Sequence, residues 1–247
     1  VQVSPTIEIP IRRADAMTLV LAGNYAGVRL DKKPRYAETI ALCDAFQRTY
    51  PDAVRCETFG TTPEGRPMKL LVVSRSGALD PVAARERGVP VVQFQGGIHA
   101  GEIDGKDAGF LALRELLDGS AAKGALDDVV VLFVPVFNVD GHERFGPNQR
   151  PNQRGPVETG WRVNAQNLNL NRDYAKAETI EMQAMLGLLG RFDPLLYVDL
   201  HVTDGADFQP QGSSARRAAR RRAPERARAG ITRCGACEIA DHQGGTA

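Results

Sequence analysis

Residues 89–105 read VPVVQFQGGIHAGEIDG, and this stretch decides how the chain is expected to fold. Its first part, VPVVQFQ, is a short and mostly apolar run of the kind that is buried on both faces in a mixed or parallel sheet. Apolar residues then recur near helical spacing from Glu102 to Leu117, and Asp118-Gly119 closes that element. A buried strand that leads into an amphipathic helix indicates the α/β class.

The segments on either side extend this pattern. Residues 35–50 have helical spacing, and residues 54–62 and 68–74 flank a turn, which predicts a helix followed by a β-hairpin. DVVVLFVPVF at 128–137 and LLYVDL at 195–200 are further buried strands, and residues 175–189 return to a helical pattern. We therefore predict an α/β fold with a mixed, mostly parallel central sheet flanked by helices.

A long polar stretch at 138–171 lies between these elements. A loop of that length inside a compact domain is usually functional. It is rich in Gly, Pro, Asn and Arg, so we expect a few apolar residues to anchor it: Phe145, Val157, Trp161, Val163 and Leu168.

Two histidines and one glutamate lie at the ends of predicted strands. His99 and Glu102 follow the strand at 89–95, and His201 follows the strand at 195–200. Two imidazoles and one carboxylate are usual ligands of a catalytic zinc, which keeps its fourth position open for water. Strand ends of an open α/β sheet meet at one edge, so we predict one Zn²⁺ per chain bound by these three residues. His142, in a polar turn, is expected to be solvated or hydrogen-bonded and is left out of the metal site.

Composition limits the other function classes. The chain has 247 residues, of which 43% are hydrophobic, so one large domain over residues 1–212 is the simplest division. No apolar run is long enough to cross a membrane, and no signal peptide is visible, which leaves a secreted, periplasmic or cytoplasmic location open. The net charge of +1 gives no reason to expect nucleic acid as a partner.

The last residues differ in character from the rest. Residues 213–247 contain eight Arg and almost no large apolar side chain, so this tail is expected to be disordered or to lie loosely on the surface as a helix. Its Cys234 and Cys237 form a single Cys-x-x-Cys pair, for which we expect no metal or redox role. Cys43 and Cys56 fall in a predicted core helix and strand, and we expect them to be buried thiols that behave as small apolar side chains.

Five segments in order resemble the zinc carboxypeptidase family of the carboxypeptidase A type. His-x-x-Glu followed by a distant His is similar to its metal motif, and FNVDGHERFG at 137–146 resembles its Asn-Pro-Asp-Gly turn. Trp161-Arg162 resembles the Trp-Arg segment of the family, and NLNLNRDY at 167–174 resembles its Asp-x-Asn-Arg segment. The resemblance extends from about Tyr36 to Gln209, which is most of the chain.

The resemblance implies a hydrolase that uses zinc-activated water to cleave a C-terminal peptide bond. Its substrate would be a peptide or an acylamino acid with a free C-terminal carboxylate. By motif, Asn171 and Arg172 would bind that carboxylate, and Arg162 would polarise the scissile carbonyl. The family has Asp where this chain has Asn169, and we expect the amide oxygen of Asn169 to accept the proton of a metal-bound imidazole.

Besides Asn169, the chain differs from the family pattern after the third metal ligand, where the family has a general-base Glu and a Tyr that covers the substrate. Here the only later glutamates are Glu225 and Glu238, and no Tyr follows Tyr197. We therefore expect the catalytic domain to be incomplete at its C-terminus, by a frame change or a truncation near Gln211. Two alternatives stay open: a zinc amidase or deacylase of the same fold, and a zinc-binding inactive fragment or pseudoenzyme.

Overall fold

The computed structural model describes residues 36–149 and 158–202. The predicted boundary near residue 212, the Arg-rich tail, Cys234, Cys237 and the late glutamates lie outside these ranges, as does Val157. Within the described ranges, no helix has both the length and the apolar character needed to cross a bilayer.

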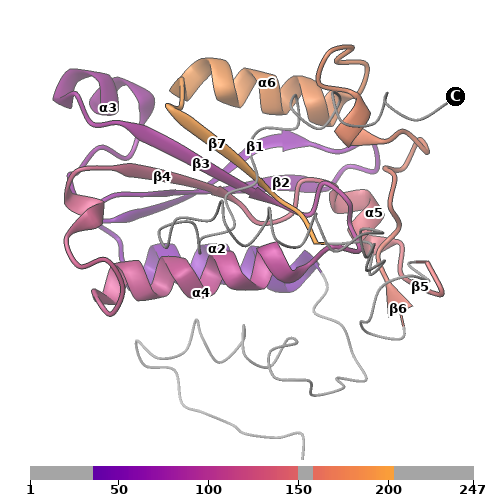
Figure 1. The fold of residues 1–247 in the computed structure, drawn as a ribbon, viewed down its shortest axis with the longest axis horizontal. Helices are drawn as coiled ribbons and strands as arrows, with labels where there is room; N and C mark the ends of the chain where they lie inside the picture. The colour runs from indigo at the N-terminus through magenta and orange to yellow at the C-terminus, as the bar shows by residue number, and fades with distance from the viewer. Residues whose placement is uncertain (1–35, 150–157, 203–247) are drawn as a thin grey trace, which may run out of the picture.

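A sheet forms the centre of the molecule (Figure 1). Its strand order is β1-β2-β4-β3-β7. Of these described strands, β2 alone runs against the others, because it pairs antiparallel with both β1 and β4, whereas β3 pairs parallel with β4 and with β7. The predicted mixed, mostly parallel sheet is therefore confirmed. The strands are β1 (Val54–Thr61), β2 (Pro67–Val73), β3 (Val91–Gly96), β4 (Val130–Val134) and β7 (Leu196–Leu200).

Helices cover both faces of this sheet. Figure 1 shows α3 (Pro81–Arg87) and α6 (Ile180–Phe192) on one face, with α2 (Tyr36–Thr49) and α4 (Asp104–Asp118) on the other. Side chains of a strand alternate between the two faces, so β2 contributes to two cores. Its residues Leu70 and Val72 pack with α6, and Leu71 and Val73 pack with α2 and α4.

Two helices begin later than their apolar patterns indicate. Helix α4 begins at Asp104, so Glu102 lies in the turn before it. Helix α6 begins at Ile180, five residues after the predicted start at residue 175. Polar contacts explain the second difference. The carboxylate of Asp173 accepts hydrogen bonds from the backbone N–H groups of Glu178 and Thr179, and the Thr179 hydroxyl caps Met182 N.

Cys43 and Cys56 form a disulfide, so the prediction of buried free thiols is wrong. Their Cα atoms are 5.5 Å apart because α2 packs directly on β1. In the sequence, each cysteine lies in an apolar pattern of its own element, Cys43 in a helix and Cys56 in the following strand. Only the packing of one element on the other shows that the two sulfur atoms meet.

The stretch at 138–171 contains short elements in place of a plain loop. They are α5 (Val139–Glu143), β5 (Gly146–Pro147), β6 (Glu158–Thr159) and η2 (Leu170–Arg172); a further 3-10 turn, η1 (Ala125–Asp127), precedes β4.

Polar side chains do much of the anchoring in this stretch. Two of the expected apolar anchors, Trp161 and Leu168, are 39% and 37% exposed. Asn138 and Asn164 are instead completely buried. Asn138 accepts a hydrogen bond from Gly141 N, and Asn164 accepts from the backbone N–H of Leu168. Buried amides that satisfy the backbone therefore hold the stretch in place.

Candidate metal centre

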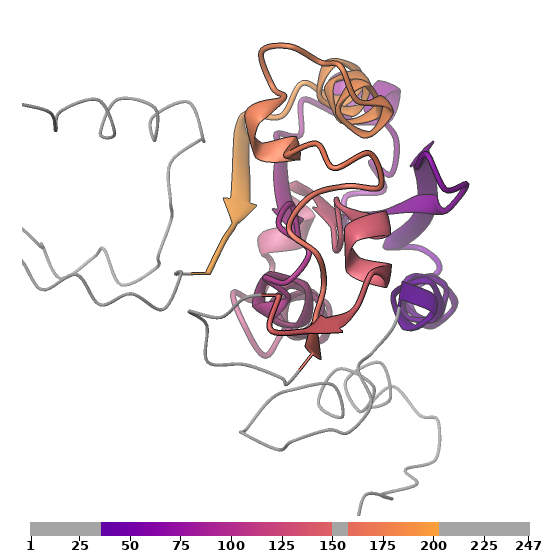
Figure 2. The same ribbon diagram turned by 90° about the vertical axis from the view of Figure 1, so that its right-hand side faces the viewer.

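The ends of β3 and β7 lie side by side, because Gly96 of β3 pairs with Leu200 of β7. His201 follows Leu200 directly, and His99 follows Gly96 after three positions. Gly97 has a φ of 64°, a left-handed conformation that favours glycine, and it turns the chain away from the sheet. Figure 2 looks onto this edge of the molecule, where α5 and the short strands β5 and β6 also lie.

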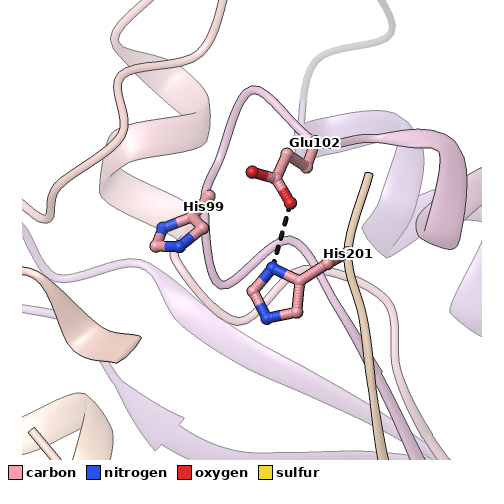
Figure 3. Close-up of side chains that lie close together, drawn as sticks. All are labelled: His99, Glu102 and His201. Atoms are coloured by element: carbon pink, nitrogen blue, oxygen red, sulfur yellow. Dashed lines mark hydrogen bonds and ion pairs between the residues drawn. The ribbon is translucent and has the colours of Figure 1, made fainter. Parts of the chain in front are cut away.

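His99, Glu102 and His201 come together at this edge, as the sequence predicts. Each offers one ligand atom, and these atoms lie within 4.8 Å of one another, which suits a single metal ion. The three side chains face one another in Figure 3. His99 and Glu102 are buried, while the side chain of His201 is 24% exposed. An ion held here would therefore be close to solvent on the side of His201.

Two carboxylates flank the imidazole of His201. Its Nδ1 lies 3.0 Å from Oε2 of Glu102, and its Nε2 lies 3.1 Å from Oδ2 of Asp199. Burial by itself lowers the pKa of His201, but the hydrogen bonds and charges of Asp199 and Glu102 outweigh it and raise the pKa to about 10. Metal binding at Nδ1 would therefore release a proton.

Asp199 is the site residue to which sequence reasoning gave no role. A ligating imidazole commonly donates its second N–H to a carboxylate, which fixes the ring and its tautomer. Asp199 and His201 are two residues apart at a strand end, so both side chains point to the same side of the sheet. In the sequence, the Asp-x-His spacing is the pattern that predicts the contact between Asp199 and His201.

The other imidazole, that of His99, contacts the side chain of Asn171. We expected Asn169 to accept the imidazole proton, but Oδ1 of Asn169 accepts a hydrogen bond from Asn171 N at 3.0 Å. Nδ2 of Asn171 lies 3.4 Å from Nε2 of His99. Asn169 caps η2, and this capping turns its side chain toward its own backbone.

Arg162 belongs to a segment that packs directly on the turn between His99 and Glu102. A Cβ atom at Gly160 would lie 2.5 Å from the carbonyl oxygen of Ala100, so only glycine permits this approach. The next residue, Trp161, donates its backbone N–H to Gly141 O at 2.7 Å. These contacts place the backbone of Arg162, a partly buried residue, at the edge of the sheet that carries the ligands.

Arg172 follows Asn171 in η2 and is exposed. Its guanidinium donates to the carbonyl oxygen of Asn171 at 2.9 Å. An exposed guanidinium one residue away from a side chain that touches His99 is well placed to meet an anion that approaches the ligand cluster.

His142, expected to be a solvated or hydrogen-bonded turn residue, is buried on α5 and hydrogen-bonded. Its Nδ1 lies 3.4 Å from Oε1 of Glu143, and its ring stands edge-on to those of Tyr36 and Phe145. The hydrogen bond from His142 holds the pKa of Glu143 at about 2, with a further contribution from the Tyr36 backbone N–H. His142 therefore joins α5 to the start of α2.

Comparison with known proteins agrees with this geometry. The family model described as zinc carboxypeptidase matches residues 39–229. The chain belongs to the zinc carboxypeptidase family. Carboxypeptidase B of Astacus astacus is 28% identical over 141 residues, which cover 57% of this chain and 44% of that protein. A Saccharomyces cerevisiae protein named an inactive metallocarboxypeptidase is 38% identical over 103 residues, which cover 40% of this chain and 23% of that protein.

Solved zinc carboxypeptidases share the fold. Carboxypeptidase A from Helicoverpa armigera superposes with a TM-score of 0.54 at 20% sequence identity, over 77% of this chain and 52% of that structure. This chain thus spans about half the length of that structure and less than half of the two sequence relatives.

Proposed function

We propose that this chain is a zinc-dependent hydrolase of the metallocarboxypeptidase type, which cleaves a C-terminal peptide bond. The observation that carries the proposal is the convergence of His99, Glu102 and His201, whose ligand atoms lie within 4.8 Å of one another. Two neutral ligands and one carboxylate leave a divalent ion with a net positive charge. The burial of His99 and Glu102 limits competition from water for this ligand set.

A zinc ion bound here would lower the pKa of a bound water and polarise a substrate carbonyl. The protein residues supply the rest. Asp199 holds the ring of His201 at Nε2, so that Nδ1 faces Glu102 and would be the nitrogen that binds an ion. The backbone N–H of Val202 also donates a hydrogen bond to Oε2 of Glu102 at 3.0 Å, which keeps this carboxylate in place.

The substrate we propose is a peptide or an acylamino acid with a free C-terminal carboxylate. Arg172 and Asn171 would bind that carboxylate, because a guanidinium donates two parallel hydrogen bonds to a carboxylate and remains charged at working pH. Arg162 would lie against the scissile carbonyl. Support for these roles comes from their motif matches and from the position of both segments at the ligand edge.

Metal analysis of His99→Ala tests the zinc site. The purified chain is expected to retain about one zinc, and the variant is expected to retain none, because two remaining ligands do not hold the ion through dialysis. His242→Ala is the control, since it removes one of the other histidines of the sequence outside the ligand set. Full zinc content in His99→Ala would remove the assignment.

Blocked dipeptides with free or amidated C-termini test the reaction. Cleavage of the free acids alone supports a carboxypeptidase, and equal cleavage of both supports the amidase or deacylase alternative. Arg172→Ala is expected to raise KM for the free acids by about 10- to 100-fold, because it removes a charge-assisted hydrogen bond to the carboxylate. The zinc content should stay unchanged. An unchanged KM would show that Arg172 does not bind the carboxylate.

A zinc-binding protein without turnover is the second candidate. One observation favours it: the Saccharomyces cerevisiae relative is named inactive. The late glutamates of this chain, Glu225 and Glu238, also lack the sequence context of the family's general base. Full zinc content together with no cleavage of either dipeptide series would decide for this candidate.

A further inference from the structure

Gln95, Tyr174 and Tyr197 form a closed set of hydrogen bonds, the tyrosine cluster. The hydroxyl of Tyr197 on β7 donates to Oε1 of Gln95 on β3 at 2.8 Å, and the hydroxyls of Tyr174 and Tyr197 lie 2.6 Å apart. Because Tyr197 gives its one hydroxyl proton to Gln95, Tyr174 is the donor to Tyr197. Nε2 of Gln95 in turn donates to the Tyr174 hydroxyl at 3.4 Å. Each member of the cluster therefore both donates and accepts.

The tyrosine cluster is fixed on the two strands that lead to the metal ligands. Gln95 is completely buried in β3, where an amide without hydrogen-bond partners would be costly. Its Cα partner on β7 is Asp199, whose carboxylate contacts His201. The two tyrosines are partly buried, and their rings stand edge-on with centroids 6.3 Å apart. The cluster thus has little freedom to move relative to these strands.

Tyr174 connects the cluster to the segment that contains η2. It lies two residues after Arg172, the last residue of η2. Leu170, at the start of η2, is completely buried in the core cluster against which Tyr174 also packs. The carboxylate of Asp173 accepts a hydrogen bond from Thr179 N, just before α6. The segment is therefore held to α6 through Asp173 and to β3 and β7 through Tyr174.

The position of Arg172 depends on this attachment. Its exposed guanidinium donates to the carbonyl oxygen of Asn171, a contact within η2 that does not fix it relative to the metal ligands. A substrate whose carbonyl meets a metal and whose carboxylate meets Arg172 requires a fixed spacing between the two. We propose that Tyr174 and Tyr197 are positioning residues that set this spacing, because they tie η2 to the strand that leads to His201.

The inference rests on the proposed carboxylate-binding role of Arg172. The two tyrosines lie outside the ligand cluster and act through the position of η2. Loss of either hydroxyl should therefore weaken recognition of a C-terminal carboxylate. It should leave zinc content and the binding of amidated peptides unchanged, since neither depends on Arg172.

The test compares the zinc-loaded unmodified chain with Tyr174→Phe and Tyr197→Phe, which each remove one hydroxyl and keep the ring. The probes are benzoyl-glycyl-phenylalanine, benzoyl-glycyl-lysine and benzoyl-glycyl-glutamate, each as the free acid and as the C-terminal amide. The quantity compared is KM for a probe that is cleaved and the dissociation constant for a probe that is only bound. Each variant is expected to raise the constant for the free acids by about 3- to 10-fold, the effect of one hydrogen bond, with no change for the amides.

Tyr50→Phe is the matched control. The Tyr50 hydroxyl donates to Oδ1 of Asp118 at 2.5 Å, at the end of α4 that lies away from Glu102. This variant also loses a hydroxyl hydrogen bond of the fold, but it should leave the ratio of the free-acid and amide constants unchanged. The double variant Tyr174→Phe/Tyr197→Phe is expected to match either single variant, because both hydroxyls act through one connection.

Free-acid constants that stay unchanged in both tyrosine variants would overturn the inference while the role of Arg172 stood. An equal rise for acids and amides, or the same rise in Tyr50→Phe, would also overturn it, because the effect would then come from a general weakening of the fold. A double variant whose rise is the product of the two single rises would show that the hydroxyls do not act together. If the unmodified chain binds free acids no better than amides, the carboxylate role of Arg172 fails, and this inference fails with it.

Discussion

At the scale of single residues, the neighbours of His201 set its chemical state. Asp199 and Glu102 hold a proton on this imidazole in the absence of a metal, with a pKa of about 10. The same two carboxylates favour a cation, so a proton and a metal ion would compete for Nδ1. The residues that make the site attractive to a metal therefore also make metal binding depend on pH.

Glu38 provides a prediction about stability and pH. It lies partly buried on α2, near Lys106 and Asp107 of α4. Burial is the main cause that raises its pKa from 4.5 to about 7; Lys106 lowers the pKa and Asp107 raises it. Between these pH values the folded chain keeps a proton that the unfolded chain has lost, so Glu38 makes the fold less stable as pH rises.

Glu38→Gln is expected to remove this loss of folding stability at high pH, because glutamine does not ionise. At pH 8 the variant should be more stable than the unmodified chain by about 1–3 kcal/mol, and at pH 4 the two should be nearly equal. Urea unfolding at both pH values measures the difference. The control is Glu86→Gln, on the exposed surface of α3, which should change little at either pH. A difference at pH 8 no larger than that at pH 4 would contradict the argument.

At the scale of elements, the disulfide ties α2 to β1 and closes a loop between residues separated by 13 positions. A cross-link over a loop of this length restricts the unfolded chain and contributes about 2–4 kcal/mol. Reduction with a thiol is therefore expected to lower the melting temperature of the unmodified chain, as thermal unfolding with and without reductant will show.

The double variant Cys43→Ala/Cys56→Ala is the control for this prediction. It retains Cys234 and Cys237, so any effect of reductant that remains in it belongs to the tail cysteines. Peptide mapping after alkylation should find Cys43 and Cys56 protected before reduction. If both are alkylated in the native protein, the disulfide does not form.

The elements differ in how far local sequence determines them. The strands β3, β4 and β7 could be predicted because each is a compact apolar run between polar turns. The start of α6 could not, because the carboxylate of Asp173 binds the backbone N–H groups of Glu178 and Thr179, which belong to a helical sequence pattern. The disulfide and the Asn171 contact were missed for a different reason, since each joins two separate elements that meet only in the folded chain.

The convergence of His99, Glu102 and His201 was predictable because strand ends of a parallel pair meet at one edge. The Asp199 contact follows from the same periodicity, two residues before His201. Asn169 was assigned by alignment to a motif, and a motif does not record which way a side chain turns. The side chain of Asn169 caps η2 by accepting a hydrogen bond from Asn171 N, and the side chain of Asn171 faces His99.

At the scale of the whole molecule, the ligand cluster joins distant parts of the chain. His99 and Glu102 come from the end of β3, and His201 comes from the end of β7. Among the described strands, β7 pairs with β3 alone, and Leu195 beside it is 81% exposed. An ion bound across these ends would link this outer strand to the centre of the sheet.

Zinc is therefore expected to stabilise the fold as a whole. At a free zinc concentration 1,000 times the dissociation constant, the free energy of unfolding should rise by about 4 kcal/mol. For a chain of this size, the melting temperature should rise by about 8–16 °C. A chelator should reverse the change, and His201→Ala should abolish it, because the link to β7 is then lost. An equal rise in His201→Ala would mean that zinc stabilises the chain from another place, and replacement of Cys234 and Cys237 would then show whether the tail supplies it.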